Sequence, residues 1–132
     1  MNIDKSLLGL VIKNLHRLII TNISLDIFTI VNIFNAIKLS IILKSLKITS
    51  NDLSFVTGLD ECISNVHEVD LTNCQITTFQ YNNLVHNLKN SRITKLTMVG
   101  VFGHGFGGFS ETIKYKEKLI EACNQQGIIF QF

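Results

Sequence analysis

One apolar spacing returns four times along the sequence, and this repetition restricts the possible folds more than any other feature of the chain. The spacing is L-x-x-L-x-L-x-x-N-x-L, where L is an apolar residue. Complete copies occupy residues 43–53 and 66–76, a copy over 15–25 has Ile at the Asn position, and a copy from residue 93 fails at Gly103. The copies begin at residues 15, 43, 66 and 93, so successive units are 28, 23 and 27 residues long. Repeats of about 20 to 30 residues are typical of stacked structural units.

Each copy predicts a short strand with two inward side chains. Neighbouring side chains of a strand point to opposite faces, so the fourth and sixth residues of a unit share one face. Stacked units bury these faces in a continuous core and align their strands in a parallel sheet. The six residues expected to be buried together are Leu46, Ile48, Val69, Leu71, Leu96 and Met98. At the ninth position, Asn51 and Cys74 are expected to be buried and to serve backbone groups of the turn that follows.

The second half of each unit has helical spacing, in which apolar residues three or four positions apart lie on one side of a helix. The sets with this spacing are Ile30, Phe34 and Ile37, then Leu84 and Leu88, then Leu119 and Cys123. The 23-residue unit leaves room for a helix only around residues 59–64. Residues 4–14 are predicted to form the helix of a preceding half-unit or a cap. Residues 124–132 are predicted to end in a strand whose side chains alternate inward from Ile128.

On these copies the chain resembles the leucine-rich-repeat family, and the unit over 66–92 resembles its ribonuclease-inhibitor-like class, whose repeats run to about 28 residues with a full helix. The resemblance implies an α/β fold: a short, right-handed, curved solenoid with parallel strands on the concave face and helices on the convex face. It implies a single domain over residues 1–132, with a half-unit or cap at 1–14. It also implies a non-catalytic module that binds a protein partner through the concave face.

The side chains that point away from the core form two rows across the predicted sheet. The residue between the two inward side chains of each strand gives Ile19, Lys47, Asp70 and Thr97. The residue two positions earlier gives Arg17, Ser45, Glu68 and Lys95. Adjacent strands lie about 5 Å apart, so Lys47 could pair with Asp70 and Glu68 with Lys95. The alternatives for this face are an ordinary solvated surface and a partner-binding surface, and the resemblance favours binding.

A glycine-rich loop after the fourth predicted strand offers a nucleotide-binding alternative. Gly103, Gly105 and Gly108 satisfy G-x-G-x-x-G between a predicted strand and a predicted helix. However, Glu111 would occupy the first helical turn, where a phosphate should bind. No Gly-Lys-Ser/Thr follows, as a Walker loop would require. A long connection between repeats is therefore the favoured interpretation, and no cofactor is expected.

Three phenylalanines of the same loop are a second candidate surface. Phe102, Phe106 and Phe109 alternate with glycines, which cannot shield them from water. The rings either fold down over the end of the stack or serve as aromatic anchors for a partner. Burial is the favoured expectation, and the three rings remain the competing partner-binding site.

Composition excludes several other classes of function. The 12 Lys and Arg nearly balance the 10 Asp and Glu, so a nucleic-acid partner is not indicated. The apolar stretch from 23 to 43 is interrupted by Asp26, Asn32, Asn35 and Lys38, which argues against a membrane span. The three cysteines are odd in number and widely spaced, which favours free thiols in the cytoplasm and no zinc site.

No catalytic or metal-binding constellation is visible in the sequence. His16, His67, His86 and His104 belong to different units and form no His-x-x-x-His pair. Cys62 and Cys74 are predicted core residues, and G-x-S-x-G is absent, so the chain is not expected to be an enzyme. Two further possibilities stay open: the chain is the sensing or autoinhibitory end of a larger cytosolic NOD-like receptor, or it self-associates through the strand from Ile128 to Phe132.

Overall fold

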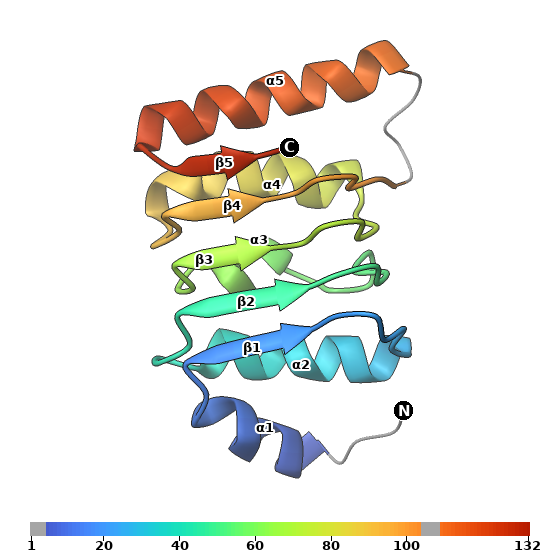
Figure 1. Cartoon of the computed structure of the whole chain (residues 1–132), viewed down its shortest axis with the longest axis vertical. Coiled ribbons are helices and arrows are strands. Elements are labelled where there is room, and N and C mark those ends of the chain that lie inside the picture. The colour runs from blue at the N-terminus through green and yellow to red at the C-terminus, as the bar shows by residue number, and fades with distance from the viewer. Residues whose placement is uncertain (1–4, 104–108) are drawn as a thin grey trace.

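The computed structural model describes residues 5–103 and 109–132, with side chains for 7–103 and from 113 onwards. In this part of the chain, five parallel strands form one sheet in the order β1-β2-β3-β4-β5, so the fold is α/β (Figure 1). The strands are β1 (Arg17–Ile20), β2 (Ser45–Ile48), β3 (Glu68–Asp70), β4 (Lys95–Thr97) and β5 (Ile129–Gln131). The helices are α1 (Lys5–Lys13), α2 (Ile27–Leu39), α3 (Leu59–Ile63), α4 (Thr78–Asn87), the 3-10 helix η1 (Leu88–Asn90) and α5 (Phe109–Gln126).

The strand register predicted from the repeated spacing is confirmed. Leu46 of β2 lies beside Val69 of β3, which lies beside Leu96 of β4. The six inward residues predicted to be buried are each exposed by 2% or less and belong to one core cluster. Burying an aliphatic side chain of this size contributes about 1.5 to 3 kcal/mol, so this column is a major source of stability.

Helices cover one face of the sheet and leave the other face open (Figure 1). The residues predicted to face inward on these helices are buried. The short α3 occupies the region expected for the 23-residue unit. In α4, the N-cap Thr77 and Gln80 form a capping box, and the Gln80 Nε2 donates to the carbonyls of Leu53 and Val56 at 2.8 and 2.9 Å. This side chain therefore anchors the start of α4 to the preceding unit.

The apolar stretch around residues 23–43 contains the helix α2, one side of which is buried. Its N-cap is Asp26, whose Oδ1 accepts a hydrogen bond from the Thr29 N–H at 2.8 Å. A carboxylate at this position satisfies a backbone donor that has no partner within the helix. Burial of Ile30, Phe34 and Ile37 accounts for the apolar inner side of this helix, whereas Phe28 and Leu39 of the same helix are 82% exposed. In the described ranges, no helix is both long and apolar enough to cross a bilayer.

After the strand, each of the four predicted units contains a residue in the left-handed backbone region. Asn22, Ser50, Asn73 and Gly100 have φ of 60, 55, 59 and 68°, and each is the eighth residue of its unit. Glycine adopts this region at no steric cost, and asparagine tolerates it better than most residues. The eighth residue of the repeat therefore needs a left-handed backbone, which the apolar spacing does not predict.

The ninth position is buried in both complete copies, as predicted. The Asn51 Nδ2 donates to the carbonyls of Ile23 and Thr49, both at 2.9 Å, and its Oδ1 accepts from the Leu25 N–H at 2.8 Å. The Cys74 Sγ donates to the carbonyl of Ile48 at 3.2 Å. Most of these partners belong to the preceding unit, so the expectation that the ninth residue serves the following turn is wrong. Stacking brings the turn of the preceding unit beside this position.

Gly103 interrupts the fourth copy because the preceding unit leaves no room for a side chain. A Cβ at Gly103 would lie 1.6 Å from the carbonyl oxygen of Ile76. The neighbouring Phe102 carbonyl accepts a hydrogen bond from the Ile76 N–H at 2.8 Å. The two backbone segments therefore cannot separate without losing this bond. A packing requirement accounts for the first glycine of the loop.

We expect Gly103→Ala to lower the free energy of unfolding by about 1 to 3 kcal/mol, the usual cost of forcing extra volume into a packed site. Gly9→Ala is the matched control, because a Cβ at Gly9 meets no atom within 4 Å and Gly9 lies inside α1. That substitution should raise stability by about 0.5 to 1 kcal/mol through helix propensity. Denaturant unfolding of both variants measures the difference, and effects of the same sign would contradict this account of Gly103.

Candidate functional site

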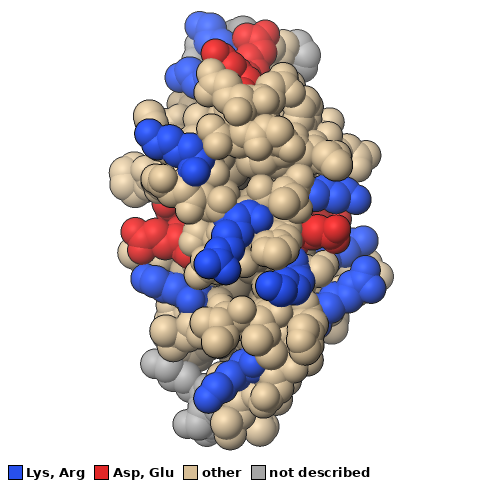
Figure 2. All heavy atoms as spheres, turned by 90° about the vertical axis from the view of Figure 1, so that its left-hand side faces the viewer, with Lys and Arg blue, Asp and Glu red and all other residues tan. Residues whose placement is uncertain are grey.

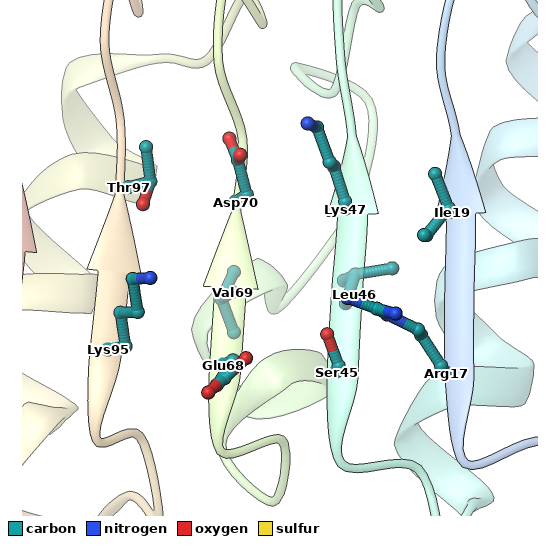
Figure 3. Close-up of a pocket in the computed structure, with 10 residues that line it drawn as sticks. All are labelled: Arg17, Ile19, Ser45, Leu46, Lys47, Glu68, Val69, Asp70, Lys95 and Thr97. Atoms are coloured by element: carbon teal, nitrogen blue, oxygen red, sulfur yellow. The ribbon is translucent and has the colours of Figure 1, made fainter.

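The open face of the sheet carries the two predicted rows of side chains. Arg17, Ser45, Glu68 and Lys95 lie side by side on successive strands, and so do Ile19, Lys47, Asp70 and Thr97. Together with Leu46 and Val69, these eight residues line a hollow of about 140 Å³ (Figure 3). We call this surface the open-face site. The arrangement of both rows follows from the parallel register, because equivalent residues of successive units stand beside one another.

The side chains of the open-face site leave a depression over β2. Ser45 is small, and the long Arg17 side chain reaches from β1 toward β2 beside it (Figure 3). Lys47 and Asp70 extend toward the ends of their strands, while Glu68 lies near the start of β3 (Figure 3). The hollow thus has polar and charged groups on its walls and a short side chain at its floor.

Charge in the open-face site forms bands: two basic strands, then an acidic strand, then a basic strand. Arg17 of β1 and Lys47 of β2 are basic, Glu68 and Asp70 of β3 are acidic, and Lys95 of β4 is basic. A partner surface would have to present the opposite order of charges to match these bands. Like charges brought together at any interface cost several kcal/mol, so this order of charges restricts which surfaces could pack against the sheet.

The predicted pairing of these charges across strands is not what the structure contains. Within the described residues, neither Lys47 with Asp70 nor Glu68 with Lys95 forms a salt bridge. The Asp70 Oδ1 instead accepts hydrogen bonds from the N–H and the hydroxyl of Thr72 at 3.0 and 2.6 Å. A carboxylate bonds to backbone two residues ahead with little loss of side-chain entropy, whereas an exposed ion pair gains about 0 to 1 kcal/mol.

A basic edge adjoins the open-face site. Figure 2 views the molecule from the side at which the strands begin, and Lys and Arg side chains occupy the middle of this face with Asp and Glu at its margins. Exposed basic residues just before the strands include Lys13, Lys44 and Arg92. The apolar spacing did not predict this edge, because the spacing specifies only the strand residues. The signal was present: a basic residue stands within a few positions before β1, β2 and β4.

The structure places the first of the three loop phenylalanines at the surface. Phe102 is 55% exposed, so the expected burial of this ring is wrong. Its backbone forms a parallel bridge with Gln75, which forms another with Asp52. All three occupy the tenth position of their units, whose side chains point away from the core. Phe106 lies outside the described residues, and so does the side chain of Phe109, which begins α5.

Three other exposed phenylalanines were not predicted as surface residues. Phe28 and Phe79 are the second residues of α2 and α4, and Phe55 lies in the turn before α3. Phe79 borders a groove of about 380 Å³ between the starts of α3 and α4. Apolar spacing alone assigns such residues to the core, because it cannot tell the inner side of a helix start from its outer side.

The three thiols of the chain lie in the core, away from the open-face site. Cys62, Cys74 and Cys123 are buried free thiols. Burial raises the pKa of Cys74 and of Cys123 from 9.0 to about 11 and also raises the pKa of Cys62, so all three stay protonated at neutral pH. In residues 5–103 and 109–132, no group of three or more His, Cys, Asp or Glu could hold a metal ion.

The glycine loop gains no support as a nucleotide site. The close approach of Ile76 explains Gly103 by packing, and Gly105 and Gly108 lie outside the described residues, as does His104. The open-face site is therefore the best-formed candidate in the described part of the chain, with both predicted rows in place around one hollow.

A comparison with known protein families and with curated protein sequences found no match to this chain.

Proposed function

We propose that this chain is a short leucine-rich-repeat solenoid that binds a protein partner through the open-face site, which would form the concave side of a right-handed stack. Three observations support the family assignment. The units add one parallel strand each in chain order, the inward residues of successive units pack together, and the eighth residue of each of four units is left-handed. A repeat that cannot bury its apolar face alone gains stability by stacking in this way.

The main support for this proposed function is the hollow of about 140 Å³ on the sheet face that the described helices leave open. Its charged side chains do not pair with one another across the strands, so they remain available to a partner. The side chains are held in fixed rows by strands rather than by loops, which lowers the conformational entropy lost on binding. A charged rim around a small pocket is typical of a recognition surface.

We further propose that the module is non-catalytic and acts in the cytoplasm. The three free cysteines suit a reducing compartment. Their protonated, buried thiols are poor nucleophiles. The partner is expected to be a protein with acidic groups toward the basic edge and a basic group toward Glu68, because these match the charges that line the open-face site.

Reversing one charge of the open-face site should weaken binding without unfolding the chain. Glu68→Lys is the sharpest variant, because Glu68 is exposed and lies in the wall of the hollow. We expect a partner captured by the wild-type chain to lose at least about tenfold in affinity, since a buried interfacial charge pair contributes about 1.5 to 7 kcal/mol. The measurement is quantitative pull-down from the native cytosol with mass spectrometry, followed by titration of the captured protein.

Two controls separate this site from its competitors. Glu121→Lys makes the same charge reversal at an exposed residue of α5 outside the open-face site and should leave binding unchanged. Phe102→Ser removes the exposed ring of the competing loop site. Loss of binding in Phe102→Ser with full binding in Glu68→Lys would move the interface from the open-face site to the loop.

A further inference from the structure

The helix layer contains a groove beside the shortest of its helices. Helix α3 has 5 residues, whereas α2 and α4, between which it lies, have 13 and 10 (Figure 1). A helix rises about 1.5 Å per residue, so α3 is about 7.5 Å shorter than α4. Two hollows lie along the boundary of α3 and α4, one of about 380 Å³ at the helix starts and one of about 180 Å³ farther along. We call them together the α3–α4 groove.

The carboxylate of Asp60 lines both hollows of the α3–α4 groove. Asp60 is 6% exposed, and its Oδ2 accepts a hydrogen bond from the Nδ2 of Asn87. Among the described residues, no other group donates to this carboxylate, and Lys38 forms its ion pair with Glu61 at 3.3 Å instead. Every fully enclosed side-chain oxygen of these residues has a partner, so the unpaired Oδ1 of Asp60 is the atom that reaches the groove.

This arrangement differs from that of Gln80, the other buried polar side chain of the groove. The Gln80 Nε2 donates to two carbonyls of the preceding unit, and its Oε1 accepts from the Thr77 N–H at 2.8 Å. Both ends of that amide are therefore satisfied within the chain. Asp60 has one amide donor for a whole charge, and burying a charge is costly unless it is paired. A cation entering the groove would supply the missing partner.

The remaining wall of the larger hollow suits the apolar part of a basic side chain. Val56 and Leu59 line it, and the Phe79 ring, which is 73% exposed, stands at its border. An aromatic ring attracts a cation placed over its face. Neither hollow is lined by a lysine or an arginine among the described residues. The chain itself therefore offers no cation to this carboxylate and this ring.

We propose that the α3–α4 groove binds a basic side chain of a protein partner, and that arginine fits it best. The guanidinium would donate to the Oδ1 of Asp60, and the methylene chain would pack on Leu59 and Phe79. Arginine is favoured over lysine because its planar, weakly hydrated head both pairs with a carboxylate and stacks on an aromatic ring. The half-buried Asn83 lines the same hollow and offers a side-chain carbonyl to a further N–H. This surface lies on the helix-covered side of the sheet and does not depend on the open-face site.

The test begins with a random peptide library displayed on phage. The library is selected on the full wild-type chain and depleted on Asp60→Asn, which keeps the size of the side chain and an oxygen for Asn87. We expect the enriched peptides to share an arginine beside an apolar residue. In titrations of the best peptide, Asp60→Asn should lower the affinity at least about tenfold, because a hydrogen bond to a charged group is lost. Replacing the peptide's arginine with citrulline, which is uncharged, should cause a similar loss, and the two changes together should cost little more than either alone.

Further variants locate the peptide in the groove. Phe79→Ala should weaken binding several-fold, whereas Phe28→Ala, at the same second position of α2 and 82% exposed, should not. Asn83→Lys places a cation in the larger hollow and should abolish binding, which keeps the test decisive if thermal melting shows that Asp60→Asn does not fold. Glu68→Lys changes the open-face site and should leave the affinity for the peptide unchanged.

Several results would overturn the proposal. One is a selection that yields no peptides enriched in basic residues. Another is a selected peptide whose affinity is the same with citrulline, or the same for Asn83→Lys as for the wild type. Loss of binding in Glu68→Lys but not in Asp60→Asn would place the peptide on the open-face site. Displacement of the peptide by spermidine at an equal concentration would assign the groove to a small amine rather than to a protein partner.

Discussion

Replacing Leu71 with alanine should lower the free energy of unfolding by about 2 to 5 kcal/mol, the range measured for buried leucines elsewhere. Leu71 is fully buried and follows β3 at the middle of the inward column. Its equivalents in the neighbouring units, Ile48 and Met98, are fully or almost fully buried as well. Alanine would leave a cavity that the two flanking units cannot close without moving their strands. Denaturant unfolding of the variant and the wild type measures the loss.

The matched control for Leu71 is Leu39→Ala. Leu39 is the last residue of α2 and is largely exposed, so the same truncation there should change stability by under about 0.5 kcal/mol. Equal effects of the two substitutions would show that the inward column is not the core of the fold. Since domains of this kind are stabilised by about 5 to 15 kcal/mol in total, Leu71→Ala should also lower the melting temperature clearly.

Replacing Asn51 with alanine should cost about 2 to 4 kcal/mol, because it removes three hydrogen bonds to backbone groups at once. Asn51 is 4% exposed, and its amide joins the turn over 23–25 to the end of β2. The carbonyl of Ile23 and the N–H of Leu25 would lose these partners. The loss should appear in denaturant unfolding and as faster hydrogen exchange at Leu25.

The two ninth-position residues provide the control for this prediction. Asn51→Cys installs the residue found at the equivalent Cys74 and retains one donor, so its effect should lie between that of alanine and the wild type. Cys74→Ala should cost less than Asn51→Ala, since Cys74 makes a single sulfur hydrogen bond. A cost of under about 1 kcal/mol for Asn51→Ala, the value of a single ordinary hydrogen bond, would mean that water replaces the amide at this position.

Asp70 is a poor residue for testing the open-face site by mutation, because it also supports the turn after β3. Asp70→Lys would remove the two hydrogen bonds from Thr72 as well as the charge. A loss of binding in that variant would combine an altered turn with an altered surface. Glu68 and Lys47 are better probes, because both are exposed and neither supports the turn that follows its strand.

The order of the strands, their register and the identity of the inward residues could all be predicted from the repeated spacing. These features follow from a local period: alternation along a strand selects Leu46 and Ile48, and the repeated spacing aligns them with Val69 and Leu71. The same period predicted both rows of the open-face site. It succeeded because equivalent positions of stacked units have equivalent surroundings.

The contacts of the polar and aromatic groups could not be predicted from the spacing and depend on the packing of the whole chain. Asp70 bonds to Thr72 rather than Lys47, Asn51 serves the preceding unit, and the Phe102 ring stays at the surface. Gly103 is required by a backbone from another unit. Each of these outcomes depends on distances of a few ångströms between segments more than 20 residues apart or on competition between near-equal hydrogen bonds. The spacing of apolar residues specifies only the face on which a side chain lies. It does not specify which groups of other segments lie near that side chain, or which of several hydrogen bonds it forms.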